Sequence, residues 1–124
     1  MHKSGEDYLE AILQLSLEQE KEEVRITDIA KKLGVAKSSV SRAINNLKEE
    51  GFVSQELYSD VVLTVKGRMK ASQVYSRHKA LTAFLEEILG VSKETAEHDA
   101  CLIEHDISSE TMEKLVAFIE ASGK

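Results

Sequence analysis

Three residue types that bind divalent metal ions occur together near the end of the sequence. Cys101, Glu104 and His105 follow one another at spacings of three and one. On a helix, positions i, i+3 and i+4 lie on one face within a single turn. A thiolate, a carboxylate and an imidazole form a mixed ligand set that suits Fe²⁺, Mn²⁺, Co²⁺ or Zn²⁺. The segment therefore predicts a metal site.

Three ligands from one helix seldom complete a coordination shell, so we expect further ligands elsewhere. Asp7 and Glu10 lie three residues apart in the first predicted helix, and His78 lies in a long helix in the middle of the chain. His2 and His98 have no evident partner in the pattern and are expected at the surface. A lone helical histidine is usually structural, and a lone buried cysteine usually packs as a small apolar side chain. The residue types alone leave this plain structural interpretation open.

The same residues allow a catalytic interpretation, which the rest of the chain disfavours. Cys101 and His105 lie one turn apart, and a cysteine–histidine pair can perform nucleophilic catalysis. However, the sequence has no glycine-rich loop for an oxyanion or a phosphate, and the chain is short for a substrate cleft. We therefore do not predict an enzyme.

The composition indicates a short chain with an aliphatic core. The 124 residues include no Pro, no Trp and a single Cys, and 42% are hydrophobic. This length suits one compact unit or a small domain with an appended helical segment. One cysteine cannot form an intramolecular disulfide framework. Because the sequence has no signal-peptide pattern and no apolar run of membrane-spanning length, we expect a soluble, cytoplasmic protein with no membrane partner.

Charge is distributed unevenly along the chain. The formal net charge is −6, yet residues 25–79 carry 11 Lys and Arg against 5 Asp and Glu, a net of +6. The remaining residues carry a net of −12. Chance clustering on solvated helix faces would give a similar pattern. A basic middle between acidic ends also fits a module that faces nucleic acid beside an acidic sensor module.

A helix-turn-helix pattern lies in this basic middle. Residues 26–33 form a short amphipathic pattern, for which Thr27 is the expected N-cap and Gly34 the expected left-handed residue at the C-terminal end. In the next helix, over residues 37–50, four apolar residues recur at helical spacing and are expected to face the core: Val40, Ala43, Ile44 and Leu47. The opposite face carries Ser, Arg and Asn, which suit a DNA major groove. The predicted DNA contacts are Thr27, Lys37, Ser38, Ser39, Ser41, Arg42, Asn45, Lys48 and Tyr58.

The elements after this pattern complete the predicted fold. Residues 52–57 and 61–65 are expected to form a β-hairpin, the wing of a winged helix. A long helix follows from Lys66 to Leu89, and Ser92 and Ser108 are expected to begin two final helices. The sequence therefore predicts a mainly α fold. A winged helix-turn-helix domain spans residues 1–66, and a helical metal-binding and dimerisation domain spans residues 67–124.

With these motifs identified, the chain resembles the iron- and manganese-dependent repressors of the diphtheria-toxin-repressor and manganese-transport-regulator family. The resemblance extends from Gly5 to about Leu115. Its most specific segments are Glu6-Asp7-Tyr8-Leu9-Glu10, Val40-Ser41, Leu63-Thr64-Val65-Lys66-Gly67, Arg77-His78, Phe84-Leu85, and Ala100-Cys101 with Glu104-His105. The resemblance implies a homodimer that, when loaded with Fe²⁺ or Mn²⁺, binds a palindromic DNA operator and represses metal-uptake genes. The chain is similar to the short form, without an SH3-like domain.

The resemblance also implies a ligand set that mixes two branches of the family. Asp7 and Glu10 match first-helix ligands of the manganese branch, and His78, Glu104 and His105 match the remaining ligands of the family pattern. Cys101 stands where the manganese branch has a Glu and matches the iron branch instead. Thr82 stands where the iron branch has an ancillary Glu. A thiolate favours Fe²⁺, Co²⁺ or Zn²⁺ over Mn²⁺, which prefers oxygen ligands.

Two other functions remain open at this point. The first is a metal-independent winged-helix regulator in which Cys101 is oxidised in response to redox conditions. The second is a winged helix that serves only as a protein-interaction module. A metal sensor would lose its response in chelator, a redox sensor would lose its response in Cys101→Ser, and an interaction module would bind no duplex DNA.

Overall fold

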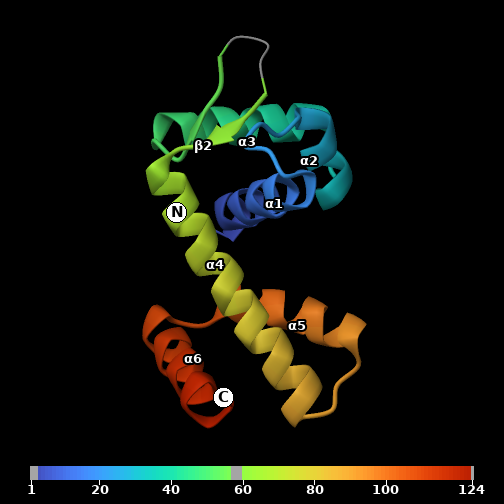
Figure 1. The fold of residues 1–124 in the computed structure, drawn as a ribbon, viewed down its shortest axis with the longest axis vertical. Coiled ribbons are helices and arrows are strands. Elements are labelled where there is room, and N and C mark those ends of the chain that lie inside the picture. Colours follow the sequence, from blue (N-terminus) through green and yellow to red (C-terminus); the bar gives the residue numbers. More distant parts are fainter. Residues whose placement is uncertain (1–2, 57–59, 124) are drawn as a thin grey trace. The chain divides into compact units, whose positions relative to one another are not determined.

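The structure of the chain is a computed structural model that describes residues 3–56 and 60–123 (Figure 1). Helices dominate the described residues, and a short hairpin interrupts them. In chain order the elements are α1 (Lys3–Gln19), α2 (Ile26–Leu33), α3 (Lys37–Glu49), β1 (Val53–Ser54), β2 (Val62–Leu63), α4 (Val65–Ala83), a π-helical turn η1 (Phe84–Ile88), α5 (Lys93–Asp106) and α6 (Ser109–Gly123). The predicted mainly α fold is confirmed.

The chain forms two compact units that divide within α4. The first unit extends to Gln73, and the second begins at Val74. The predicted domain bounds, 1–66 and 67–124, remain a prediction. In the described residues, no helix is both long enough and apolar enough to cross a membrane.

The first unit is a winged helix with α1 at its centre. Helix α1 contacts α2, α3 and β2, and α2 contacts α3. The strands β1 and β2 pair in antiparallel fashion, with Val53 opposite Leu63, and a single bridge joins Val24 to Val61. Aliphatic side chains fill the core, and the fully buried ones include Leu9, Ile12, Val24, Ile29, Val40, Ile44 and Val61. This core holds α3 in place from its apolar side.

Local details of the helix-turn-helix partly match the prediction. Gly34 ends α2 with a left-handed φ of 69°, and its N–H donates to the Ala30 carbonyl, as predicted. The prediction of Thr27 as N-cap is wrong. The N-cap position is held by Arg25, two residues earlier, so α2 begins at Ile26, and Arg25 makes no side-chain capping bond. A residue type favoured at N-caps is only a weak indication of where a helix begins. The wing strands are also shorter than the predicted hairpin, with two residues each.

The second unit is built from the later part of α4, η1, α5 and α6. Its core is a cluster of six buried residues: Leu81, Leu85, Ala96, Ala100, Met112 and Ile119. Both predicted caps are present. The Ser92 hydroxyl accepts from the Thr95 N–H at 3.4 Å, and the Ser108 hydroxyl accepts from the Thr111 N–H at 3.1 Å. These caps set the starts of α5 and α6, and so the register of the ligand candidates on α5.

Candidate functional site

Helix α3 presents a polar surface opposite its buried side. Val40, Ile44 and Leu47 are buried. The predicted DNA-contact residues lie on the other side of the helix: Lys37, Ser38, Ser39, Ser41, Arg42, Asn45 and Lys48. Ser39 is half-buried, and the others are exposed. Thr27 on α2 is exposed as well. Helix α3 therefore has the two predicted faces. One is apolar, and the other carries hydroxyl, amide and guanidinium groups.

The charges on this helix remain available to an anionic ligand. Within the described residues, Lys37, Arg42 and Lys48 make no ion pair with a carboxylate. Ala36 is the residue before α3. Its side chain has no oxygen that could accept hydrogen bonds from the N–H groups in the first turn of the helix. Helix N-termini with open N–H groups favour phosphate. Hydroxyls, amides and guanidinium groups on such a helix can bond base edges, and its lysines can neutralise phosphates.

The wing lies beyond α3 in the chain. Thr64 donates its N–H to the Phe52 carbonyl at 3.0 Å, and this bond closes the base of the hairpin. The predicted DNA contact Tyr58 falls in residues 57–59, outside the described residues. Its role therefore remains a prediction.

In the second unit, the structure brings together His78 of α4 and Glu104 of α5. The His78 Nδ1 atom lies 3.5 Å from Glu104 Oε1, and the Glu104 side chain is only 1% exposed. Neither carboxylate oxygen of Glu104 has a hydrogen-bond donor among the described residues. Burying a carboxylate without hydrogen bonds is costly, and buried charges in proteins are usually paired or coordinate metals. Glu104 therefore fits a metal ligand better than a structural residue.

Cys101 and His105 form a second pair of ligand candidates on α5. Both are half-buried, and a Cys101 Sγ atom and a His105 ring nitrogen lie within 4.8 Å of each other. Their i, i+4 spacing produces this proximity on one helix face. Glu104 belongs to the same turn but is paired with His78 instead. Sequence spacing had placed Cys101, Glu104 and His105 in one group, whereas the structure pairs the middle residue with another helix.

The two remaining candidates lie in the first unit. Asp7 and Glu10 stand one turn apart on α1, with Asp7 half-buried and Glu10 9% exposed. Gln14 donates its amide to Glu10 Oε2 at 3.3 Å. Glu6, next to Asp7, lies 3.4 Å from the Lys70 ammonium. Two carboxylates one turn apart on a helix suit a hard or borderline divalent cation.

The sequence reasoning missed Gln14, which orients one of these carboxylates. Its position four residues after Glu10 on an expected helix was the available indication, since i, i+4 side chains meet on a helix surface. It also missed that Thr82 donates its hydroxyl to the His78 carbonyl at 2.8 Å. This bond stays within α4 and involves the His78 backbone carbonyl.

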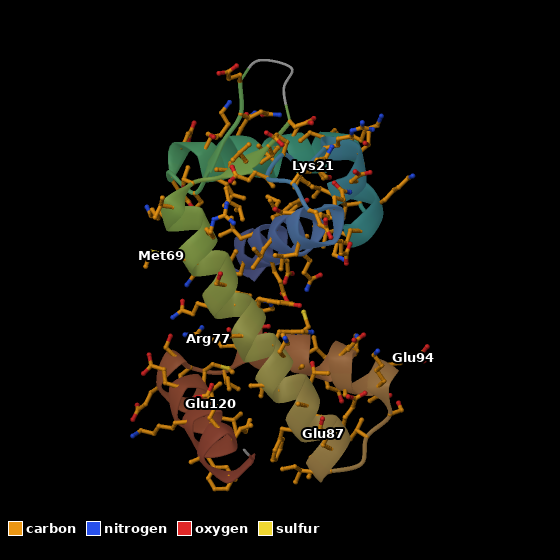
Figure 2. The ribbon with its side chains drawn as sticks, in the orientation of Figure 1. Lys21, Met69, Arg77, Glu87, Glu94 and Glu120 are labelled. Atoms are coloured by element: carbon orange, nitrogen blue, oxygen red, sulfur yellow. The ribbon has the colours of Figure 1, made fainter. Side chains whose placement is uncertain are left out.

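Acidic side chains cover much of the second unit. The exposed Glu87, Glu94 and Glu120 come from η1, α5 and α6 (Figure 2). The exposed bases Lys37, Arg42 and Lys48 come instead from α3 in the first unit. Three bases of the predicted basic middle thus lie on the exposed face of α3, and three exposed carboxylates lie on elements of the second unit.

Two families of known domains match this chain. Residues 1–61 match the iron dependent repressor N-terminal DNA binding domain. Residues 64–122 match the iron dependent repressor metal binding and dimerisation domain. The two matches together cover nearly the whole chain.

Individual proteins match over most of the chain as well. An uncharacterized HTH-type transcriptional regulator of Methanocaldococcus jannaschii is 37% identical over 120 residues, which are 97% of this chain and 95% of that protein. The transcriptional regulator MntR of Salmonella typhimurium is 36% identical over 118 residues, 95% of this chain and 73% of that protein. The solved structure of the manganese regulator SloR has a TM-score of 0.77 at 30% identity and covers 94% of this chain. This chain spans 53% of the length of that solved relative.

Proposed function

This chain belongs to the iron-dependent repressor family, and from this premise we propose that it is a transcriptional repressor controlled by a divalent metal ion. It acts as a homodimer on duplex operator DNA, in the cytoplasm, and its role requires no catalytic step. Helix α3 enters the major groove with Ser41, Arg42 and Asn45 toward the bases, and Lys37 and Lys48 neutralise phosphates. The exposure of these side chains supports this role.

We propose that the metal ligands are Asp7, Glu10, His78, Cys101, Glu104 and His105. The observation that carries this assignment is the Glu104 carboxylate, buried with no hydrogen-bond donor among the described residues and 3.5 Å from His78. A bound ion supplies positive charge and fixed coordination, which offset the repulsion among these carboxylates. Because Asp7 and Glu10 belong to one unit and the other four residues to the other, occupation of the site favours one arrangement of the two units. That arrangement sets the spacing of the two α3 helices of a dimer on DNA.

The ligand chemistry leads to a proposal for the metal. Cys101 offers a soft thiolate, which favours Fe²⁺, Co²⁺ or Zn²⁺, whereas the carboxylates of Asp7, Glu10 and Glu104 suit Mn²⁺. SloR, one of the relatives reported above, is by name a manganese regulator. We propose Fe²⁺ or Mn²⁺ as the physiological ion, with Co²⁺ and Zn²⁺ as ions that the site also accepts.

The test is an anaerobic titration of reduced, metal-free protein with Mn²⁺, Fe²⁺ and Zn²⁺, with ions counted per chain. In parallel, fluorescence anisotropy follows binding to a labelled duplex that the metal-loaded protein has selected from a random library. We expect each ion that binds to raise the DNA affinity, and chelator to reverse the increase. Failure of all three ions to bind would contradict the proposal. DNA binding that persists in chelator and responds to peroxide only when Cys101 is present would support the redox alternative.

A further inference from the structure

Three hydrogen bonds attach the end of α3 to the start of α4. The chain leaves α3 through Gly51, whose φ is 85° and whose N–H donates to the Lys48 carbonyl at 3.0 Å. The next residue, Phe52, donates its N–H to the Leu47 carbonyl at 2.9 Å. This left-handed ending turns three successive carbonyls, those of residues 50–52, away from α3, where they need partners from another element.

The first turn of α4 and the residue before it supply all three partners. The Lys66 ammonium donates to the Glu50 carbonyl at 2.7 Å, and the Thr64 hydroxyl donates to the Gly51 carbonyl at 2.7 Å. The Thr64 N–H donates to the Phe52 carbonyl at 3.0 Å. We call these contacts of Thr64 and Lys66 with residues 50–52 the exit clamp. The exit clamp closes the base of the wing, because in the chain the hairpin lies between residues 50–52 and Thr64.

Lys66 makes the contact that is most specific to this arrangement. Its ammonium lies at the C-terminal end of α3, where the helix dipole favours a cation. The same ammonium lies 4.5 Å from the centroid of the Phe52 ring. One side chain thus combines a charge-assisted hydrogen bond with a cation–π contact, and both partners belong to the exit of α3.

Gly67 lets the two segments approach closely enough for these bonds to form. A Cβ atom at this position would lie 1.8 Å from the Phe52 carbonyl oxygen and 2.8 Å from its carbon. Because both are backbone atoms, no rotamer change could relieve the overlap. The segment Leu63-Thr64-Val65-Lys66-Gly67 therefore has a structural purpose that neither the metal ligands nor the DNA contacts account for.

We propose that Lys66 is a positioning residue for DNA binding, which acts through the exit clamp and does not itself contact the DNA. It holds the C-terminal end of α3 against α4, so that Ser41, Arg42 and Asn45 are presented in one orientation. Helix α4 continues from this clamp to His78, twelve residues after Lys66. The clamp thus also ties the DNA-contacting helix to the helix that carries a proposed metal ligand. This inference rests on the proposed function in taking α3 as the DNA-contacting helix.

Three variants separate positioning from the other roles that a lysine here could have. Lys66→Met removes the ammonium and keeps the apolar stem over Phe52. Lys66→Arg keeps a donor and a cation and serves as the rescue variant. Lys114→Met removes one positive charge from an exposed position on α6 and serves as the matched control.

The first measurement is amide hydrogen exchange over residues 37–52 in the absence of DNA. In Lys66→Met we expect faster exchange near the end of α3, with wild-type rates in Lys66→Arg and Lys114→Met, and thermal unfolding that remains cooperative in all three. Unchanged exchange in Lys66→Met would overturn the proposal. This readout needs neither DNA nor metal, so it can fail separately from the proposed function.

The second measurement is affinity for the selected duplex over a series of salt concentrations. If loss of the clamp leaves about a tenth of the molecules with α3 correctly oriented, Lys66→Met binds about tenfold more weakly. The slope of log affinity against log salt stays unchanged, and Lys66→Arg restores affinity. A fall in the slope of about one unit would instead show that Lys66 contacts a phosphate and would refute the positioning role. Wild-type affinity in Lys66→Met would refute it as well.

Discussion

Replacing Glu104 with glutamine tests the metal-site assignment most directly, because the change should affect the metal-free and metal-bound states in opposite directions. Glutamine preserves the shape of the side chain and removes its charge. In the structure the Glu104 side chain is 1% exposed and accepts no hydrogen bond from the described residues. If the group is a structural residue, its removal should destabilise the protein. If it is a ligand, its removal should relieve a buried charge.

The magnitude follows from the environment of the carboxylate. Burial of an incompletely compensated ion costs several kcal/mol. His78 offsets part of this cost, but its Nδ1 lies 3.5 Å away, beyond the roughly 2.7–2.9 Å of a strong charge-assisted bond. A buried glutamine amide without partners still costs about 1–3 kcal/mol. We therefore expect Glu104→Gln to raise the free energy of unfolding of the metal-free protein by about 1–2 kcal/mol.

The metal-bound state should respond in the opposite way. At a free metal concentration of about 100 times the Kd, binding stabilises the native wild type by about 2.7 kcal/mol. Glu104→Gln should lose most of this increment, so that the order of stability of the two proteins reverses between chelator and excess metal. The assay is denaturant unfolding under anaerobic conditions in chelator and in excess Mn²⁺ or Fe²⁺. Glu97→Gln, at an exposed position on the same helix, is the control and should change neither value.

Two results would refute this reasoning. A metal-free Glu104→Gln protein less stable than the wild type would show that the carboxylate has a stabilising structural role. A variant that keeps the full metal increment would show that Glu104 is not a ligand. In either case, the pairing of His78 with Glu104 would need a different explanation.

Further predictions concern individual side chains of the two proposed binding surfaces and one helix cap. Arg42→Ala should weaken binding to the selected duplex about tenfold or more, because an exposed guanidinium that contacts DNA is lost, with metal stoichiometry by titration unchanged. Metal-stimulated DNA binding by anisotropy should be lost in His105→Ala, while its circular dichroism stays native; full stimulation in this variant would disprove the ligand assignment. Ser108→Ala should lower the free energy of unfolding by about 1 kcal/mol, because the bond from the Thr111 N–H that begins α6 is removed. Equal denaturation midpoints for Ser108→Ala and the wild type would show that the cap contributes nothing.

Helix positions and several helix ends were predictable from the sequence because they depend on residues close together in the chain. The apolar repeat Val40, Ile44 and Leu47 is buried as its spacing indicated. Gly34, Ser92 and Ser108 act at helix ends as their residue types suggested. Thr27 shows the limit of such reasoning, because a good capping residue does not begin a helix when the chain already turns helical at Ile26.

The family resemblance and the identities of the ligand candidates also came from the sequence alone, since residue types and their order carry them. Only the tertiary structure decided which of these residues meet. Spacing on α5 grouped Glu104 with Cys101 and His105, yet in the folded chain Glu104 is buried and paired with His78, 26 positions earlier in the chain. The exit clamp likewise joins Lys66 to the Glu50 carbonyl, sixteen residues apart. Local hydrogen bonds and side-chain periodicity act within a few residues and can be inferred from the sequence, whereas contacts between distant residues depend on how the folded chain packs.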